Sequence, residues 1–281
     1  MKIYMDCLPC ILRQALEASR MATDNEQLHE KIMSQVISLL SSYSQYTSSP
    51  EICRDIHEVV KRLTNADDPY AGIKQRDLDA ALRLYPRLQQ YVSEGDCMSR
   101  ALKISAIGNV MDSAMNSGLS IEECIERELE KPFAKNDEQR FTQQLSSAKS
   151  MLVIGDNAGE AVFDRVLLEH LPDIKVTYAV RSMPVINDAT LKEAKTAGID
   201  RVADVLPTGC SAPGIILSEC SEEFLREFYS ADIVISKGQG NYETLSDCSR
   251  NIYFLLKAKC PVISGLLGVN LNDYVFMSSD E

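Results

Sequence analysis

The stretch Ser150-Met-Leu-Val-Ile-Gly-Asp-Asn-Ala-Gly-Glu160 decides the fold. Its first part, Met151 to Ile154, is short, wholly apolar and rich in branched side chains, which predicts a strand buried on both faces. The apolar run stops at Gly155, and residues with helical spacing follow the turn. Asp156 and Asn157 are therefore expected between strand and helix, at the carboxyl end of a parallel strand, where open α/β sheets bind ligands.

Two interpretations of this turn are open. A carboxylate beside a side-chain amide supplies two hard oxygen ligands, which suit Mg²⁺ or Mn²⁺ better than a soft metal. The alternative is an Asx turn in which the side chains of Asp156 and Asn157 cap the next helix. The stretch alone does not separate the two, but the segments that follow favour a metal.

Downstream of this stretch, short branched-rich runs alternate with helical stretches, and the runs lie at residues 175–180, 202–206, 233–236 and 261–264. The helical stretches lie at residues 161–170, 189–197, 221–229 and 242–246. This alternation predicts an α/β fold with a mainly parallel sheet, right-handed crossovers and three α/β/α layers, which is a Rossmann-like domain.

Upstream of residue 148, apolar residues recur at helical spacing almost throughout. We therefore expect two domains, an all-helical domain over residues 1–147 and a Rossmann-like α/β domain over residues 148–281 that carries the metal site. The helical domain is expected to pack over the open end of the sheet.

Composition narrows the function classes. The net charge of −12 argues against a nucleic-acid-binding surface, because phosphate neutralisation needs a basic stripe. A phosphate ester could still bind where a metal supplies positive charge. No apolar run is long enough to cross a bilayer, and the first residues lack the apolar segment of a signal peptide. Nine cysteines in such a chain indicate reduced thiols and a cytoplasmic location.

The second predicted strand ends in Arg181-Ser-Met-Pro-Val-Ile-Asn-Asp188. Asp188 is expected where the next helix begins, beside the crevice that holds Asp156. Its purely structural alternative would be to cap that helix. With Asp156 and Asn157 it completes a set of three oxygen ligands, and water would fill the remaining positions of a Mg²⁺ shell. Arg181 is interpreted as a phosphate-binding fork rather than an exposed loop residue.

The strand predicted at residues 233–236 leads into Lys237 and Gly238, a lysine and a small-residue turn suited to a phosphate. The spacing is not that of a P-loop, which argues against ATP binding of that kind. The loop of residues 207–214 is a second anion-pocket candidate through Gly209 and Ser211, and a plain turn is the equally good alternative.

One helix of the N-terminal half carries Asn109 and Asp112 on one face. Gly108 within it costs helix stability and indicates the close approach of another group. A solvated polar face is the common alternative, but we expect this helix to line the site.

Cys7 and Cys10 form the C-x-x-C of the chain. One such pair with three histidines does not complete a zinc site, and a thioredoxin-like role would need a preceding strand. A second metal site or a redox switch remains open, and two buried thiols are the favoured interpretation.

Five ordered motifs together resemble the damage-control phosphatase (ARMT-like) family, formerly the domain of unknown function 89. They are Gly155-Asp-Asn-Ala-Gly-Glu160, Arg181 to Asp188, Thr208 to Gly214, Ser236-Lys-Gly-Gln-Gly-Asn241 and Gly108-Asn-x-x-Asp112. The N-terminal C-x-x-C resembles the archaeal and microbial branch of that family. The resemblance implies a helical domain over a Rossmann-like domain, a divalent metal and the hydrolysis of small phosphate monoesters such as sugar phosphates or damaged metabolites.

The same resemblance implies residue roles. Asp156, Asn157 and Asp188 would hold Mg²⁺ or Mn²⁺, with Co²⁺ and Ni²⁺ as further candidates, and Lys237 would bind the phosphate together with backbone N–H groups at Gly209 and Gly238. Beyond what the resemblance implies, we hypothesise that Glu160 or Asp112 acts as the general base or positions the water, and that the attacking group is either metal-bound water or the Asp156 carboxylate. Two alternatives remain: a carboxyl methyltransferase that uses S-adenosylmethionine, and a non-catalytic metabolite-binding or redox-sensing protein built on the C-x-x-C.

Overall fold

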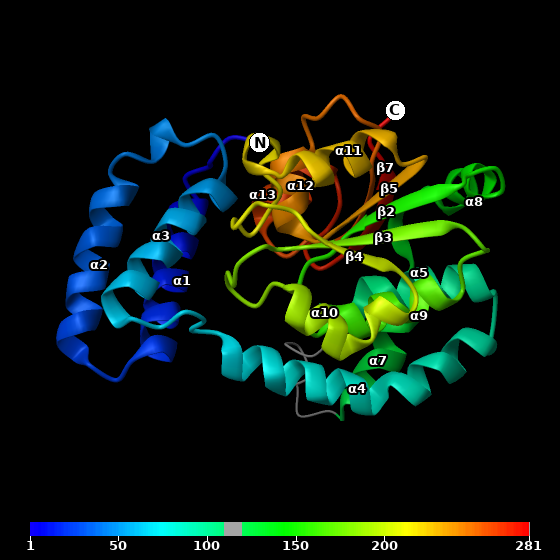
Figure 1. The fold of residues 1–281 in the computed structure, drawn as a ribbon, viewed down its shortest axis with the longest axis horizontal. Helices are drawn as coiled ribbons and strands as arrows, with labels where there is room; N and C mark the ends of the chain where they lie inside the picture. Colours follow the sequence, from blue (N-terminus) through cyan, green and yellow to red (C-terminus); the bar gives the residue numbers. More distant parts are fainter. Residues whose placement is uncertain (110–119, 281) are drawn as a thin grey trace.

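The computed structural model describes residues 1–109 and 120–280. Its described part contains a seven-stranded sheet in the order β1-β7-β6-β5-β2-β3-β4, in which β6 and β7 are antiparallel and all other neighbours are parallel (Figure 1). The strands are β1 (Phe133–Asn136), β2 (Ser150–Ile154), β3 (Lys175–Val180), β4 (Asp204–Pro207), β5 (Ile233–Lys237), β6 (Tyr253–Lys257) and β7 (Tyr274–Ser278). The α/β fold class predicted from the sequence is confirmed.

Helices cover both faces of this sheet. In Figure 1 the group on the lower face includes α4, α5, α7, α9 and α10, and the group on the upper face includes α11, α12 and α13. The bounds are α4 (Ala71–Ser93), α5 (Cys97–Ala106), α7 (Ile121–Leu129), α8 (Glu138–Leu145), α9 (Glu160–Glu169), α10 (Leu191–Ala197), α11 (Glu222–Ser230), α12 (Gln239–Leu245) and α13 (Pro261–Leu267). The described chain therefore has three layers.

Strand β2 shows why the central strands are apolar throughout. Met151 and Val153 point into the core under α4, α5 and α9, whereas Leu152 and Ile154 point into the core under α11, α12 and α13. All four are at most 1% exposed. Such double burial removes the polar alternation of a half-exposed strand, as the sequence predicts.

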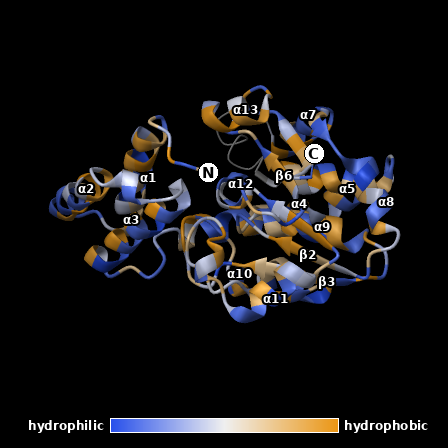
Figure 2. Cartoon of the chain, turned by 90° about the horizontal axis from the view of Figure 1, so that it is seen from above, coloured by the Kyte–Doolittle hydropathy of each residue, from blue (hydrophilic) through white to orange (hydrophobic). Residues whose placement is uncertain are grey.

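The first three helices form a separate body, which we call the helical lobe: α1 (Cys7–Ala22), α2 (Glu26–Leu40) and α3 (Ser49–Thr64). Its core, from Ile3 to Tyr70, shares no buried residue with the two cores of the sheet. Figures 1 and 2 both show the lobe beside the sheet, with the hydrophobic residues of the remaining chain gathered on the strands and the helix faces over them.

The cores do not divide at the boundary predicted between residues 147 and 148. Helices α4, α5, α7 and α8 contribute Leu84, Leu102, Ile125 and Phe141 to the same core as β2 and α9. Residues 133–136, expected among helices, form the edge strand β1 beside β7. Helical periodicity in the N-terminal half predicts which helix faces are apolar. It does not predict that the helices after residue 70 pack these faces on the sheet.

One predicted strand is a helix. Residues 261–264 lie in α13, where Pro261 occupies the first turn and the Cys260 side chain accepts from the Ile263 N–H. Proline suits a first helical turn because its missing N–H has no intrahelical partner there. The strands of this region are instead β6 and β7 on either side. None of the described helices is both long and apolar enough to cross a membrane.

Candidate active site

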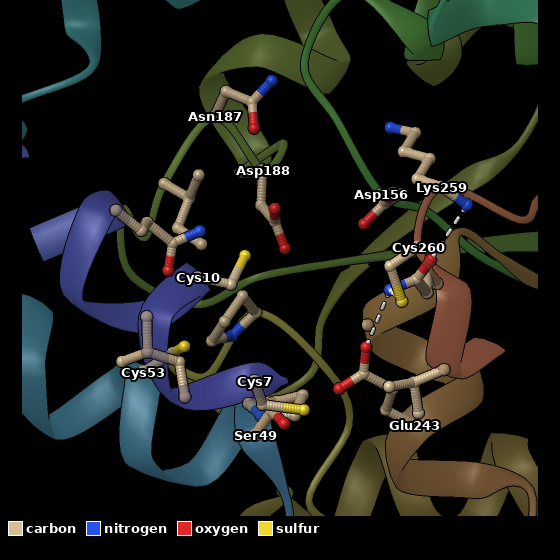
Figure 3. Close-up of a pocket in the computed structure, with 18 of the residues that line it drawn as sticks. Cys7, Cys10, Ser49, Cys53, Asp156, Asn187, Asp188, Glu243, Lys259 and Cys260 are labelled. Carbon is tan, nitrogen blue, oxygen red and sulfur yellow. Dashed lines mark hydrogen bonds between the residues drawn. The ribbon is translucent and has the colours of Figure 1, made fainter. Parts of the chain in front are cut away.

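A cavity of about 320 Å³ lies where the helical lobe meets the carboxyl ends of the central strands. The lobe contributes Asp6, Cys7, Cys10, Ile11, Gln14, Ser49, Pro50 and Cys53 to its wall. The loops of the sheet contribute Asp156, Asn157, residues 186–188, Pro213, Gln239, Gly240, Glu243 and residues 259–262 (Figure 3). The cavity is large enough for a small organic ligand.

Asp156 and Asn157 stand in the turn after β2, as predicted, but they do not cap α9. The cap position is Gly159, which has no side chain with which to cap the helix. The Asn157 amide instead donates to Glu160 Oε1 at 2.7 Å. The Asx-turn interpretation therefore does not describe this turn.

Asp188 joins Asp156 and Asn157 through the backbone. Asn157 and Asp188 form an isolated antiparallel bridge, and the Ala189 N–H donates to the carbonyl of Asp156 at 2.8 Å. The cap of α10 is Thr190, two residues after Asp188. The Asp188 carboxylate is thus not used as a helix cap, and it lines the cavity on the same side as Asp156 (Figure 3).

Arg181 lies behind these carboxylates. It is 2% exposed, its Nε donates to Asp188 Oδ2 at 2.7 Å, and its Nη2 donates to Asn241 Oδ1 at 2.8 Å. Nη2 also lies 3.9 Å from Asp156 Oδ1. Arg181 is absent from the cavity wall, so the structure makes it a residue that positions Asp188 rather than the phosphate fork expected from the sequence.

The two carboxylates are largely withdrawn from water, with 12% of the Asp156 side chain and 5% of the Asp188 side chain exposed. Burial, reinforced by the negative charge of Asp188, raises the pKa of Asp156 to about 7. Burial also raises the pKa of Asp188, although Arg181 opposes it. Two buried carboxylates that share one arginine, next to an amide, form a donor set that fits a hard divalent cation. The described residues hold no cluster of three or more His, Cys, Asp or Glu arranged for a metal, so the set depends on the Asn157 amide.

Lys237 is buried behind the cavity rather than on its wall. Its ammonium donates to the Ser105 carbonyl at 2.9 Å and to Asp164, and it lies 3.5 Å from Glu160 Oε2. Burial acts to lower the pKa of Lys237, but the carboxylates of Asp164 and Glu160 outweigh it and the pKa is raised. Lys237 therefore holds Glu160 in place, and the residue expected from the sequence to bind the phosphate is not among those that line the cavity.

Lys259 is the cavity-lining lysine of the described chain, and the sequence analysis missed it. It follows β6 and its side chain lies beside Asp156 in Figure 3. The signal was available in Lys257-Ala-Lys-Cys-Pro261, a basic segment directly after an apolar run. The predicted strands do not include β6, so they do not place its carboxyl end at the ligand-binding edge of the sheet.

The glycine loops play a different part from the one predicted. The Gly238 N–H donates to the Leu255 carbonyl within the sheet, and the Gly209 N–H donates to Ser182 Oγ at 2.6 Å. Gly209, Ser211 and Gly238 are not among the residues that line the cavity. Neither amide is therefore turned toward a phosphate in the cavity.

Glu160 lies at the start of α9 and is 3% exposed. A Cβ at Gly108 would come within 2.8 Å of Glu160 Cγ, so the close approach predicted for this glycine is confirmed. Burial raises the pKa of Glu160 to about 7, although Lys237 opposes it. Asn109 ends the short 3₁₀ turn of Ile107–Asn109 that follows α5, whereas Asp112 lies outside the described residues.

A model of the damage-control phosphatase ARMT1-like domain matches residues 3–275. The chain belongs to the damage-control phosphatase ARMT1-like family. It is 33% identical to a damage-control phosphatase of Archaeoglobus fulgidus, over 98% of each chain. It is also 35% identical to an uncharacterized protein of Methanocaldococcus jannaschii, over 98% of this chain and 95% of that one.

A solved structure shows the same fold. The crystal structure of a DUF89 family protein from Pyrococcus horikoshii matches with a TM-score of 0.90 and 30% sequence identity, and each chain is covered completely. A damage-control phosphatase of the same organism is 33% identical over 96% of this chain and 95% of its own. The family resemblance inferred from the five motifs is therefore confirmed.

The C-x-x-C of this family member opens α1 at the cavity. Cys7 and Cys10 line the wall together with Cys53 and Cys260 (Figure 3). All nine cysteines are free thiols; Cys7 is half-buried and Cys10 is exposed. The favoured interpretation of two buried thiols is therefore wrong, because α1 is amphipathic and these two residues stand at its open end.

Proposed function

We propose that this protein is a divalent-metal-dependent phosphatase that hydrolyses small phosphate monoesters. The names of its relatives support a phosphatase role. The observation that carries the metal requirement is the convergence of Asp156, Asn157 and Asp188, from two loops, on one cavity that also holds Lys259. Four carboxylates and one lysine on the wall leave too little positive charge for a phosphate dianion without a cation.

Asp156, Asn157 and Asp188 are the residues that would hold the ion, which when bound neutralises phosphate charge and polarises the phosphorus–oxygen bonds. Lys259 binds the phosphate oxygens from the side of Asp156. Arg181 fixes the orientation of Asp188 and Asn241, so the ligand set is arranged before the substrate enters.

Glu160 is held between the Asn157 amide and the Lys237 ammonium. Its carboxylate adjoins the ligand set but, like Lys237, is absent from the cavity wall, so it orients the Asn157 amide and does not contact an attacking water molecule directly. The attacking group is either water or the Asp156 carboxylate, and in the second route water then releases the phosphate from Asp156. In both routes Lys237 fixes Glu160 and does not touch the substrate.

Replacing Asp156 by Asn tests the proposal. The variant keeps the shape of the side chain but removes one charge, so hydrolysis of p-nitrophenyl phosphate with Mg²⁺, Mn²⁺, Co²⁺ or Ni²⁺ should fall at least about 1,000-fold. Calorimetric titration should show Mn²⁺ binding to the unaltered protein and none to the variant, and S-adenosylmethionine should give no heat with either. Asp200→Asn, at an exposed position, is the matched control.

Two results would overturn the proposal. The first is full activity in the Asp156→Asn variant. The second is the absence of phosphate release by the unaltered protein from a panel of sugar phosphates and phosphorylated cofactors with every one of the four metals.

A further inference from the structure

The cavity wall carries more acidic than basic side chains, and this excess of negative charge restricts which leaving groups the substrate can have. Asp6, Asp156, Asp188 and Glu243 line the cavity, whereas Lys259 is the lysine or arginine among the described lining residues. One divalent ion and one phosphate dianion roughly cancel, so the remainder of the substrate faces a wall with an excess of carboxylates. Buried like charges repel strongly because the low-dielectric surroundings screen them little.

Glu243 is the carboxylate that faces this part of the substrate. It comes from α12 and lies across the cavity from Asp156 and Asp188 in Figure 3. The residue is 9% exposed, and Gln239 Nε2 donates to its Oε1 at 3.0 Å. No lysine or arginine of the described chain is ion-paired with it. Its carboxyl group lies on the cavity wall, where Gln239, Ser49 and the N-terminal ammonium oppose the rise in its pKa that burial causes.

We infer that Glu243 is a specificity-determining residue that selects leaving groups bearing hydroxyl or ammonium donors and disfavours those bearing a second anionic group. This inference rests on the proposed phosphatase function. A carboxylate offers acceptors only, so a hydroxyl or an ammonium satisfies it. A carboxylate or second phosphate on the substrate leaves two buried anions side by side without a shared proton or cation.

Apart from Lys259, the described wall holds no cationic side chain that would offset such a repulsion, and its polar members Gln14, Ser49, Asn187 and Gln239 are neutral. Ile11, Pro50, Pro261 and Val262 are apolar, and the cysteines between them are weak hydrogen-bonding partners. Lys259 is on the Asp156 side, where the phosphate binds (Figure 3). The substrate class is thus a small phosphate monoester of a polyol or an amino alcohol.

Two matched substrate pairs test this. Glycerol 3-phosphate and 3-phosphoglycerate differ by a hydroxymethyl group against a carboxylate, and phosphoethanolamine and phosphoglycolate differ by an aminomethyl group against a carboxylate. The unaltered enzyme should favour the first member of each pair by about tenfold or more in kcat/KM. Glu243→Gln should reduce this ratio at least about fivefold, and Glu243→Asp, which keeps the charge, should keep the preference for the first member.

The control variant is Asp6→Asn, which removes an acidic charge at the exposed rim of the same cavity. Water screens that charge, so the ratio should stay within about twofold. Calorimetric binding of the phosphonate analogues of both glycerol compounds, measured on the same variants, should show the same order of affinity without turnover.

The outcomes separate the inference from the proposed function. Release of no phosphate from any of the four esters, or from p-nitrophenyl phosphate, overturns the function itself. Turnover in which the unaltered enzyme prefers the anionic member, or in which Glu243→Gln leaves the ratio unchanged, overturns the inference alone. A change in the kcat/KM ratio for Asp6→Asn as large as that for Glu243→Gln also overturns it, because the selection would then come from the overall negative charge of the cavity and not from Glu243.

Discussion

Gly238 ties the backbone after β5 to the carboxylate of Asp156. Its φ of 79° lies in the left-handed region, and a Cβ there would come within 2.0 Å of Asp156 Oδ2. The absence of a side chain at Gly238 therefore lets the loop after β5 pack directly against Asp156, the proposed metal ligand in the loop after β2. Lys237 precedes Gly238 and forms an ion pair with Glu160, so two consecutive residues position Glu160 and Asp156.

Gly238→Ala should displace the Asp156 carboxylate and reduce the hydrolysis of p-nitrophenyl phosphate at least about tenfold, because misplacing a reacting group by an ångström is costly. The circular dichroism spectrum should stay that of a folded protein. Gly265→Ala is the control: nothing lies within 4 Å of its added Cβ, so activity should be retained and stability should rise by about 0.5–1 kcal/mol. A fully active Gly238→Ala enzyme would contradict this account of the site.

At the residue scale, the sequence could predict which oxygen-bearing side chains meet, but not which cation faces the cavity. Asp156, Asn157 and Asp188 follow adjacent parallel strands, and topology alone brings them together. Arg181 follows β3 and Lys237 ends β5, yet buried carboxylates nearby form ion pairs with both. The direction of a long charged side chain depends on such partners, and these come from segments far apart in the sequence.

At the scale of elements, apolar content predicts that a buried strand exists better than it predicts the residues at which the strand begins and ends. Strands β2, β3 and β5 are buried on both faces and stand out as apolar runs between helices. β6 is also buried, but the branched residues of α13 follow it closely and have the composition that predicts a strand. β1 has four residues with alternating exposure at the sheet edge, too short a pattern to distinguish from a helical segment.

Helix α5 carries an unusual lysine. Lys103 is 5% exposed, and its ammonium lies 3.9 Å from the centroid of the Tyr274 ring and 4.6 Å from that of Phe133. Burial lowers the pKa of Lys103 from 10.5 to about 8. Because the folded-state pKa lies below the unfolded-state value, the charged form costs stability below pH 8, and this cost disappears as the pH rises from about 8 to 10.5.

Lys103→Met should therefore raise the free energy of unfolding at pH 7 by about 1–3 kcal/mol, because it removes a buried charge and keeps the length of the side chain. The difference from the unaltered protein should shrink toward pH 10, as measured by urea unfolding at both pH values. Lys149→Met, at an exposed position, should change stability by less than about 0.5 kcal/mol. Destabilisation by Lys103→Met at pH 7, or a difference independent of pH, would show that the ring contacts outweigh the burial.

At the scale of the whole molecule, the cavity lies between two bodies with separate cores. The oxygen-bearing end and Lys259 belong to the sheet, whereas Cys7, Ile11 and Pro50 belong to the helical lobe. The sequence could predict both bodies from their periodicities. It could not predict where the helices after residue 70 pack, because an amphipathic helix fits either a helix or a sheet.

The lobe is held to the sheet near the cavity by a few polar contacts. Lys61 of α3 donates to the Pro184 carbonyl at 2.6 Å, in the loop that leads to Asp188. Arg54 of the same helix pairs with Glu219. Because the lobe supplies part of the wall for the leaving group and none of the proposed metal ligands, a shift of the lobe should affect substrate binding more than the chemical step.

Lys61→Met tests this division of labour. The KM for p-nitrophenyl phosphate should rise about three- to tenfold while kcat stays within about twofold, since an interaction made equally in the bound and transition states is lost. Arg62→Met is the matched control on the same helix, because Arg62 bonds Gln35 within the lobe at 2.8 Å and should leave both constants unchanged. An equal fall in kcat and kcat/KM for Lys61→Met would mean instead that the Pro184 loop, and with it Asp188, depends on the lobe for its catalytic position.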